Sequence, residues 1–121
     1  MSVFSNISAD KVIYQGHNFF LIFDAYPVSP GHILIISNEE KPDYFDLNKE
    51  EKEELNSLIL MAKDIIEKDY KPDGYNIGMN CGIAAGQTVI HFHCHVIPRY
   101  HGDMENPRGG IRHCISGKGY Y

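Results

Sequence analysis

The sequence predicts an α+β domain in which one long helix packs on a largely antiparallel sheet. Three observations predict it. Turn signals separate β-rich runs between residues 11 and 38, an amphipathic segment with a capping pair follows over residues 48–68, and shorter β-rich runs follow over residues 75–79 and 90–98. A length of 121 residues suits one domain, so we expect a single domain over residues 1–121. We expect its tail, from about residue 99, to be an irregular, polar and glycine-rich segment.

The first elements expected are strands at residues 11–14, 19–23 and 32–36. The turn signal Gln15-Gly16-His17-Asn18 lies between the first two strands, and residues 26–31 separate the second from the third. Short strands that are joined by short connections commonly pair with their neighbours. We therefore expect consecutive antiparallel strands.

A long helix is expected from Asn48 to about Lys68. Asn48 is a good N-cap residue, and Glu51 stands three residues later, as in a capping box. The Lys-Pro-Asp-Gly run at residues 71–74 is a strong stop signal. Apolar residues at three- and four-residue spacings form one stripe, which we expect to pack on the sheet, comprising Leu55, Leu58, Ile59, Ala62, Ile65 and Ile66.

The most informative segment is the apolar run at residues 90–98, which places histidines at alternate positions, His91, His93 and His95. Successive side chains of a strand point to opposite faces, so all three imidazoles would lie on one face. A core strand has no need of three histidines, and we predict that this face is the active site. The other face would enter the core through Ile90, Phe92, Cys94 and Val96.

Composition excludes several classes of function. The net charge of −5 repels polyanions, so we expect no nucleic-acid partner. No run approaches the roughly 18 apolar residues that suggest a membrane span, and we see no secretory signal, so we expect a cytoplasmic protein without a membrane partner. The cysteines Cys81, Cys94 and Cys114 form no Cys-x-x-Cys pair and are expected to be reduced.

The residue types around the histidines suit phosphate chemistry. An imidazole titrates near about pH 6.5, so it can act as a nucleophile, a base or a donor to oxyanions. Gln87 and Thr88 precede the histidine run, and Asn80 lies shortly before them, so that neutral amide and hydroxyl groups are available to orient a phosphate. A covalent histidine adduct divides one hard displacement into two easier ones. We therefore predict double displacement.

Residues 85–99, Ala-Gly-Gln-Thr-Val-Ile-His-Phe-His-Cys-His-Val-Ile-Pro-Arg, resemble the signature of the histidine triad (HIT) family of nucleotide hydrolases and transferases. The resemblance extends upstream to Asp24 and to Pro30-Gly31-His32-Ile33-Leu34, and it covers the chain from about Val3 to Arg99. It implies a small antiparallel α+β fold with one long helix, usually a homodimer. It also implies attack on the α-phosphate of a nucleotide conjugate without a catalytic metal or other cofactor, any magnesium being bound with the substrate phosphates.

The resemblance also implies catalytic roles. His93, the middle histidine, would be the nucleophile and would form a covalent nucleotidyl intermediate. His95 would assist the leaving group, His91 would orient its neighbours by hydrogen bonding, and His32 would lie behind the nucleophile.

Substrate contacts follow from the same resemblance. Asp24 would hold the ribose hydroxyls, while Asn80, Gln87 and Thr88 would contact the phosphate or the leaving group. The run Ala-Gly-Gln-Thr-Val and the later residues 98–103 are similar to the fragile-histidine-triad and bacterial dinucleoside polyphosphate hydrolase branch. Asn80, in contrast, is typical of the phosphoramidase branch. The expected substrate is a dinucleoside polyphosphate, and the alternatives are an adenosine phosphoramidate and a nucleotide-binding module with little turnover.

Several alternatives stay open from the residues alone. The histidines of the triad together with His32 could hold zinc. Asp24 could simply cap local amides. Arg108 and Arg112 could contact phosphates or belong to a solvated turn. No structural zinc is expected, because Val3-Phe4-Ser5 lacks the cysteines that some family members have, and a structural role is expected for His17, His101 and His113.

Overall fold

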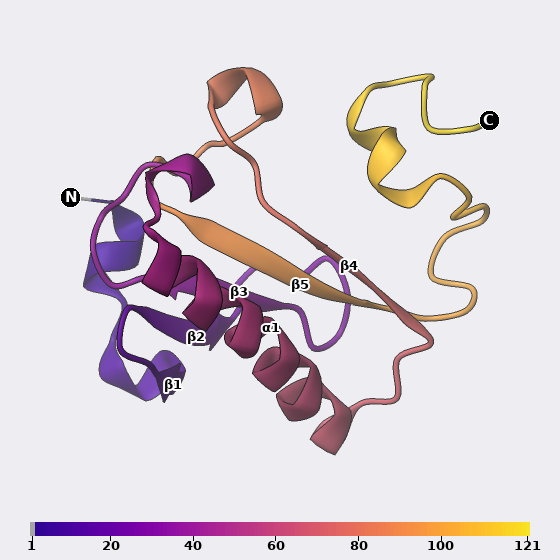
Figure 1. Cartoon of the computed structure of the whole chain (residues 1–121). Helices are drawn as coiled ribbons and strands as arrows, with labels where there is room; N and C mark the ends of the chain where they lie inside the picture. The colour runs from indigo at the N-terminus through magenta and orange to yellow at the C-terminus, as the bar shows by residue number, and fades with distance from the viewer. Residues whose placement is uncertain (1) are drawn as a thin grey trace.

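The computed structural model describes residues 2–121. Its centre is one antiparallel sheet with the strand order β1-β2-β3-β5-β4. The helix α1 (Lys49–Asp69) crosses one face of this sheet (Figure 1). This arrangement confirms the predicted α+β class with one long helix on an antiparallel sheet. The strands are β1 (Val12–Gln15), β2 (Phe19–Phe23), β3 (Ile33–Ser37), β4 (Gly74–Gly78) and β5 (His93–Arg99).

The helix begins as the capping pair predicts. The Asn48 side chain accepts a hydrogen bond from the Glu51 amide at 2.9 Å, and the Glu51 carboxylate accepts one from the Asn48 amide at 2.8 Å. Glu51 is also buried, and it forms an ion pair with Lys41 at 2.6 Å. The predicted stripe faces the sheet, with Leu55, Leu58, Ala62 and Ile66 buried and Ile59 and Ile65 partly buried.

The core has two parts because the central strands are covered on both faces. Alternate residues of β2 and β3, such as Phe19 and Ile35, pack with α1. The intervening residues, such as Ile22 and Leu34, pack on the opposite face against the N-terminal residues Phe4, Ile7 and Val12. This second layer explains why β2 and β3 are almost entirely buried, and it brings the N-terminus onto the face of the sheet that carries His93 and His95.

The histidine segment departs from the prediction at its start. Strand β5 begins at His93 rather than at Ile90, so only two of the three histidines lie on the strand itself. The prediction that Ile90 enters the core is wrong, because its side chain is 45% exposed. The Phe92 carbonyl still accepts the amide of Ser37, the last residue of β3, at 3.2 Å, but the Phe92 amide donates to the Lys41 carbonyl, in the loop before α1, at 2.6 Å. The strand pairing with β3 thus extends only to His93, and Ile90 lies beyond it.

The tail beyond β5 contains a short 3-10 helix, η5 (Gly110–Cys114), which Figure 1 shows in yellow beside the β4 and β5 side of the sheet. The tail is held largely by its own hydrogen bonds, including one from the Tyr120 hydroxyl to the Asn106 carbonyl at 3.1 Å. Across residues 2–121, no helix has both the length and the apolar character that a bilayer crossing requires.

Candidate active site

Two histidines of the triad share one face of β5. In the sheet His93 pairs with Ile36 and His95 with Leu34, and both partners belong to the core layer opposite α1. The rings of His93 and His95 are 5.2 Å apart, centroid to centroid. Alternation along the strand therefore places both rings on the face away from the helix, while Cys94 and Val96 point toward α1.

The hydrogen bonds of His93 determine which of its ring nitrogens is free. Its Nδ1 lies 2.8 Å from the backbone carbonyl oxygen of His91. Because a carbonyl oxygen only accepts, Nδ1 carries the proton and donates, and Nε2 of the neutral ring keeps its lone pair. The ring of Phe4 meets His93 edge-on, with centroids 4.9 Å apart. His93 is thus held by its backbone-facing nitrogen with the other nitrogen available for attack.

A second chain of hydrogen bonds orients His95. The Val28 amide donates to Nδ1 of His32 at 3.1 Å, so neutral His32 carries its proton on Nε2. That nitrogen lies 2.9 Å from Nδ1 of His95 and 3.5 Å from the carboxylate of Asp24. His32 therefore donates to His95, whose own proton must lie on Nε2. The arrangement gives His95 an N–H that can be donated to a phosphate oxygen or a leaving group.

Burial keeps this pair of histidines neutral. Desolvation, and then the proximity of His93 and His32, lowers the pKa of His95 to about 4, although Asp24 acts in the opposite direction. Desolvation also lowers the pKa of His32, again opposed by Asp24. Near neutral pH, His95 is consequently a neutral hydrogen-bond donor in the ligand-free protein rather than an imidazolium.

This depressed pKa predicts acid-dependent stability. The pKa of His95 is 6.5 in the unfolded state and about 4 in the folded state, so between these two pH values the unfolded state binds the proton more readily. The free energy of unfolding therefore falls as the pH falls through that window. Urea unfolding at about pH 7 and about pH 5 measures the drop. The drop should be smaller in His95→Asn than in the wild type and unchanged in His17→Asn, which alters an exposed histidine. Equal drops in all three proteins would contradict the assignment.

His91 is buried beside the open part of the site rather than within it. Its side chain is 1% exposed, and both ring nitrogens have partners. Nε2 lies 2.7 Å from the carbonyl oxygen of Ser37, and Nδ1 lies 2.6 Å from the hydroxyl of Ser2. No sequence pattern had pointed to Ser2 or to Phe4, because these contacts join segments far apart in the sequence, with 89 positions between Ser2 and His91.

The loop before the triad separates the three residues that had been predicted to contact the substrate. Gln87 is 4% exposed, and its side-chain amide is fully engaged with backbone. Its oxygen accepts from the Gly82 amide at 2.8 Å, and its nitrogen donates to the carbonyls of Pro42 and Val89 at 2.6 and 3.1 Å. The geometry assigns Gln87 to holding the loop, whereas Asn80 and Thr88 remain exposed.

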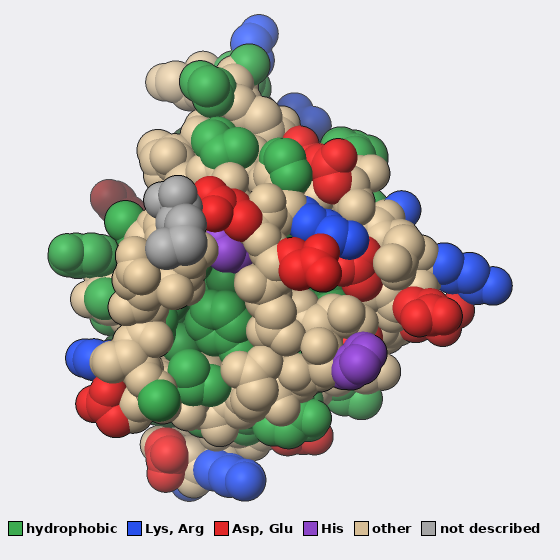
Figure 2. Space-filling model, turned by 90° about the vertical axis from the view of Figure 1, so that its left-hand side faces the viewer, with side chains coloured by type: hydrophobic (Ala, Val, Ile, Leu, Met, Phe, Trp, Pro, Cys, Tyr) green, Lys and Arg blue, Asp and Glu red, His purple; other side chains and the backbone are tan. Residues whose placement is uncertain are grey.

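Asp24 combines a local contact with a place at the site. One carboxylate oxygen accepts the Tyr26 amide at 2.9 Å, as expected of a turn-capping residue, while the other faces His32. Asp24 also lines a pocket of about 310 Å³ together with Phe4, Ile22 and Leu34. Figure 2 shows the side of the molecule that carries the N-terminus, where hydrophobic side chains gather in a hollow and acidic and basic side chains are interspersed without a broad basic patch.

A possible set of metal ligands exists, but it differs from the one considered above. The ligand atoms of Asp24, His32 and His95 lie within 4.8 Å of one another, and His93 is not among them. The donor pattern does not suit a cation, since the Val28 amide occupies Nδ1 of His32 and leaves its proton on Nε2. A metal would have to displace that proton and the bond to His95. The expectation of metal-free chemistry remains a prediction.

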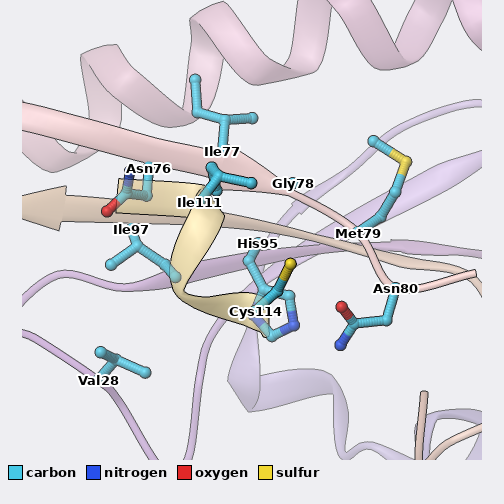
Figure 3. Close-up of a pocket in the computed structure, with 10 residues that line it drawn as sticks. All are labelled: Val28, Asn76, Ile77, Gly78, Met79, Asn80, His95, Ile97, Ile111 and Cys114. Atoms are coloured by element: carbon cyan, nitrogen blue, oxygen red, sulfur yellow. The ribbon is translucent and has the colours of Figure 1, made fainter. Parts of the chain in front are cut away.

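A second pocket, of about 350 Å³, is lined in part by His95. Figure 3 shows that its lining comes from β4 and the two residues after it, from β5, from Val28 between β2 and β3, and from Ile111 and Cys114 of η5. The side chains of Arg108 and Arg112 are not part of this lining. They lie over the ring of Tyr121, at 5.3 and 4.5 Å from its centroid.

Comparisons with known proteins agree with this geometry. The family model described as "HIT domain" matches residues 6–102. An "AP-4-A phosphorylase" of Mycobacterium tuberculosis is 32% identical over 93 residues, which are 76% of this chain and 48% of that protein. A "Bis(5'-nucleosyl)-tetraphosphatase [asymmetrical]" of Schizosaccharomyces pombe is 39% identical over 78 residues, 64% of this chain and 43% of that protein. The chain thus spans about half the length or less of these two curated relatives.

A solved structure shows the same fold. The crystal structure of a HIT family member from Bacillus subtilis superimposes with a TM-score of 0.76 at 26% identity, covering 84% of this chain and 75% of that one. The family match includes His32, which directly precedes β3, the strand β5 with His93 and His95, and the loop of Gln87. The chain therefore belongs to the HIT family.

Proposed function

We propose that this protein hydrolyses dinucleoside polyphosphates by attack of His93 on the α-phosphate. The observation that carries the proposal is the hydrogen bond from His93 Nδ1 to the His91 carbonyl, which leaves the lone pair of Nε2 free. The names of relatives that act on bis-nucleoside tetraphosphates support the choice of substrate. A nucleotide hydrolase or transferase is the class common to the family.

The proposed reaction has two displacements. Nε2 of His93 forms a bond to the α-phosphorus as the bond to the bridging oxygen breaks, and the leaving nucleotide departs with that bonding pair. The Nε2–H of His95 stabilises the departing oxygen by hydrogen bonding, an orientation supported by the bond from His32. Water then attacks the phosphorus of the adduct, its proton is lost to solvent, and the P–N bond breaks to release the nucleoside monophosphate and free His93.

The pocket beside Asp24 is proposed to hold the nucleoside end of the substrate. Phe4, Ile22 and Leu34 supply apolar walls for a planar base, and the carboxylate of Asp24 can accept hydrogen bonds from ribose hydroxyls. No protein-bound cofactor has a role in these steps. Any magnesium would be bound with the phosphates of the substrate.

A second candidate function is hydrolysis of nucleoside phosphoramidates. The pocket that adjoins His95 is lined largely by apolar side chains, and no Lys or Arg stands among its described lining residues. Such a pocket fits an uncharged organic amine bonded directly to phosphorus better than it fits a polyphosphate, which prefers cationic groups. Asn80 at its edge could orient the amine.

Turnover of two substrates tests both functions. The leading proposal predicts that kcat/KM for diadenosine tetraphosphate exceeds that for an adenosine phosphoramidate of an aromatic amine, and the reverse order would support the second candidate. If calorimetry detects tight binding of adenosine monophosphate while neither substrate is hydrolysed, the protein is a nucleotide-binding module and both hydrolase proposals are wrong.

We also propose that the protein acts as a cytoplasmic homodimer. Leu60 of α1 and Ile77 of the edge strand β4 are 61% and 44% exposed, and both line one shallow pocket between the helix and the sheet. Apolar side chains gathered beside a free sheet edge are typical of an interface between subunits. Light scattering after size exclusion would report the mass, and a purely monomeric protein at micromolar concentration would contradict the proposal.

A further inference from the structure

We infer that Ser2 is a positioning residue for the reaction and that it acts on the nucleophile through His91. The hydroxyl oxygen of Ser2 lies 2.6 Å from His91 Nδ1, although 89 positions separate the two residues. Ser2 also begins the short N-terminal 3-10 helix, η1 (Val3–Asn6), whose Phe4 touches the triad. The inference rests on the proposed role of His93 as nucleophile.

The partners of His91 require a donor where Ser2 stands. Nε2 of His91 faces the carbonyl oxygen of Ser37 at 2.7 Å, so it carries the proton of the neutral ring. Nδ1 is therefore an acceptor inside a side chain that is only 1% exposed. The Ser2 oxygen already accepts the Phe4 amide at 3.1 Å, and its hydroxyl hydrogen is available for His91. Ser2 thus satisfies an acceptor that would otherwise be buried without a partner.

The link from His91 to the nucleophile is a backbone carbonyl. His91 precedes β5 and has no partner in the strand pairing with β3, so other bonds must hold its backbone. Its amide donates to the Val89 carbonyl at 2.9 Å, its ring is bonded at both nitrogens, and its carbonyl accepts the proton of His93 Nδ1. A shift of this carbonyl would weaken the one bond that selects the proton position on His93.

Packing in the same turn reinforces this link. The ring of Phe4 meets the rings of His91 and His93 edge-on, with centroid distances of 5.7 and 4.9 Å. The N-terminal turn therefore contacts His91 through a hydrogen bond and both histidines through one aromatic ring. Loss of the hydroxyl leaves His91 Nδ1 unpaired and allows the imidazole to rotate, which lowers the fraction of His93 that presents a bare Nε2.

A shape-matched pair of variants isolates the hydroxyl. Ser2→Thr keeps the hydroxyl group. Ser2→Val has a side chain of the same shape as threonine, with a methyl group in place of the hydroxyl. We expect Ser2→Val to lower kcat by about ten-fold with KM changed by less than about two-fold, and Ser2→Thr to stay within about three-fold of the wild type. Ser5→Ala, which alters an exposed serine of the same turn, is the control and should match the wild type. Proteins without N-terminal tags, verified by intact mass, are required.

The imidazole ¹⁵N spectra of histidine-labelled protein give a second, activity-independent measurement. The wild type and Ser2→Thr should show His91 protonated on Nε2 and His93 on Nδ1, and Ser2→Val should show both nitrogens of His93 exchanging the proton. Equal kcat values and equal spectra for the threonine and valine variants would overturn the inference. A loss of activity that only follows the unfolded fraction, measured by circular dichroism, would overturn it as well.

These outcomes are separable from the fate of the proposed function. If the wild type hydrolyses neither test substrate, the proposed function is wrong, and the spectra still decide whether Ser2 sets the protonation of His91 and His93. If the wild type is active and the threonine and valine variants behave alike, the inference about Ser2 alone is wrong.

Discussion

Replacing His93 with glycine is expected to lower kcat by at least about 10³-fold, because the reaction loses the atom that forms the covalent intermediate. Direct attack by water would remain, aided only by the residual positioning of the phosphate. Steady-state hydrolysis of diadenosine tetraphosphate measures the loss. Turnover at the wild-type rate would remove His93 from the mechanism.

His93→Asn is the matched variant for this experiment. The asparagine side-chain NH₂ can take over the donation that His93 Nδ1 makes to the His91 carbonyl at 2.8 Å, but it offers no nucleophile. We expect this protein to fold, to bind adenosine monophosphate and to be as inactive as the glycine variant. Equal inactivity with preserved binding attributes the loss to chemistry rather than to a collapsed site.

Replacing Gln87 with alanine is expected to lower the free energy of unfolding by about 2–4 kcal/mol, since it removes three hydrogen bonds between a buried side chain and the backbone and leaves a cavity where the side chain stood. The affected groups are the Gly82 amide and the carbonyls of Pro42 and Val89. Urea denaturation measures the change, and Thr88→Ala, an exposed change in the same loop, should stay within about 0.5 kcal/mol. A stable Gln87→Ala protein with a raised KM would instead restore the substrate contact that the sequence had suggested.

The sequence predicted most of the fold because its local signals agree with the tertiary structure. Asn48 and Glu51 form the expected capping box, and the apolar stripe of α1 faces the sheet. The alternation of His93 and His95 with Cys94 and Val96 correctly separates the site face from the core face. These patterns are local, so they need no knowledge of distant contacts.

The wrong and missing predictions share a physical cause. In each case the position of the residue depends on contacts with segments that are distant in the sequence. Ile90 lies on the surface because it stands beyond the paired part of β5, where the Phe92 amide already bonds to the loop before α1. Gln87 is buried because its amide joins the glycine loop to Pro42, 45 positions away. Ser2 contacts His91 across 89 positions of the sequence. No periodicity or spacing encodes such pairings, and the sequence therefore predicted the shared face of His93 and His95 but not the surroundings of His91 and Gln87.

The covalent intermediate on His93 is the central claim, and rapid quenching tests it most directly. Enzyme mixed with diadenosine tetraphosphate carrying ³²P in its α-phosphates is stopped with base during the first turnover, and the acid-labile label is mapped by peptide digestion. The mechanism predicts an adenylyl group on the peptide that contains His93, formed no more slowly than turnover. Wild-type turnover without any labelled peptide, or a label on a different residue, would contradict it.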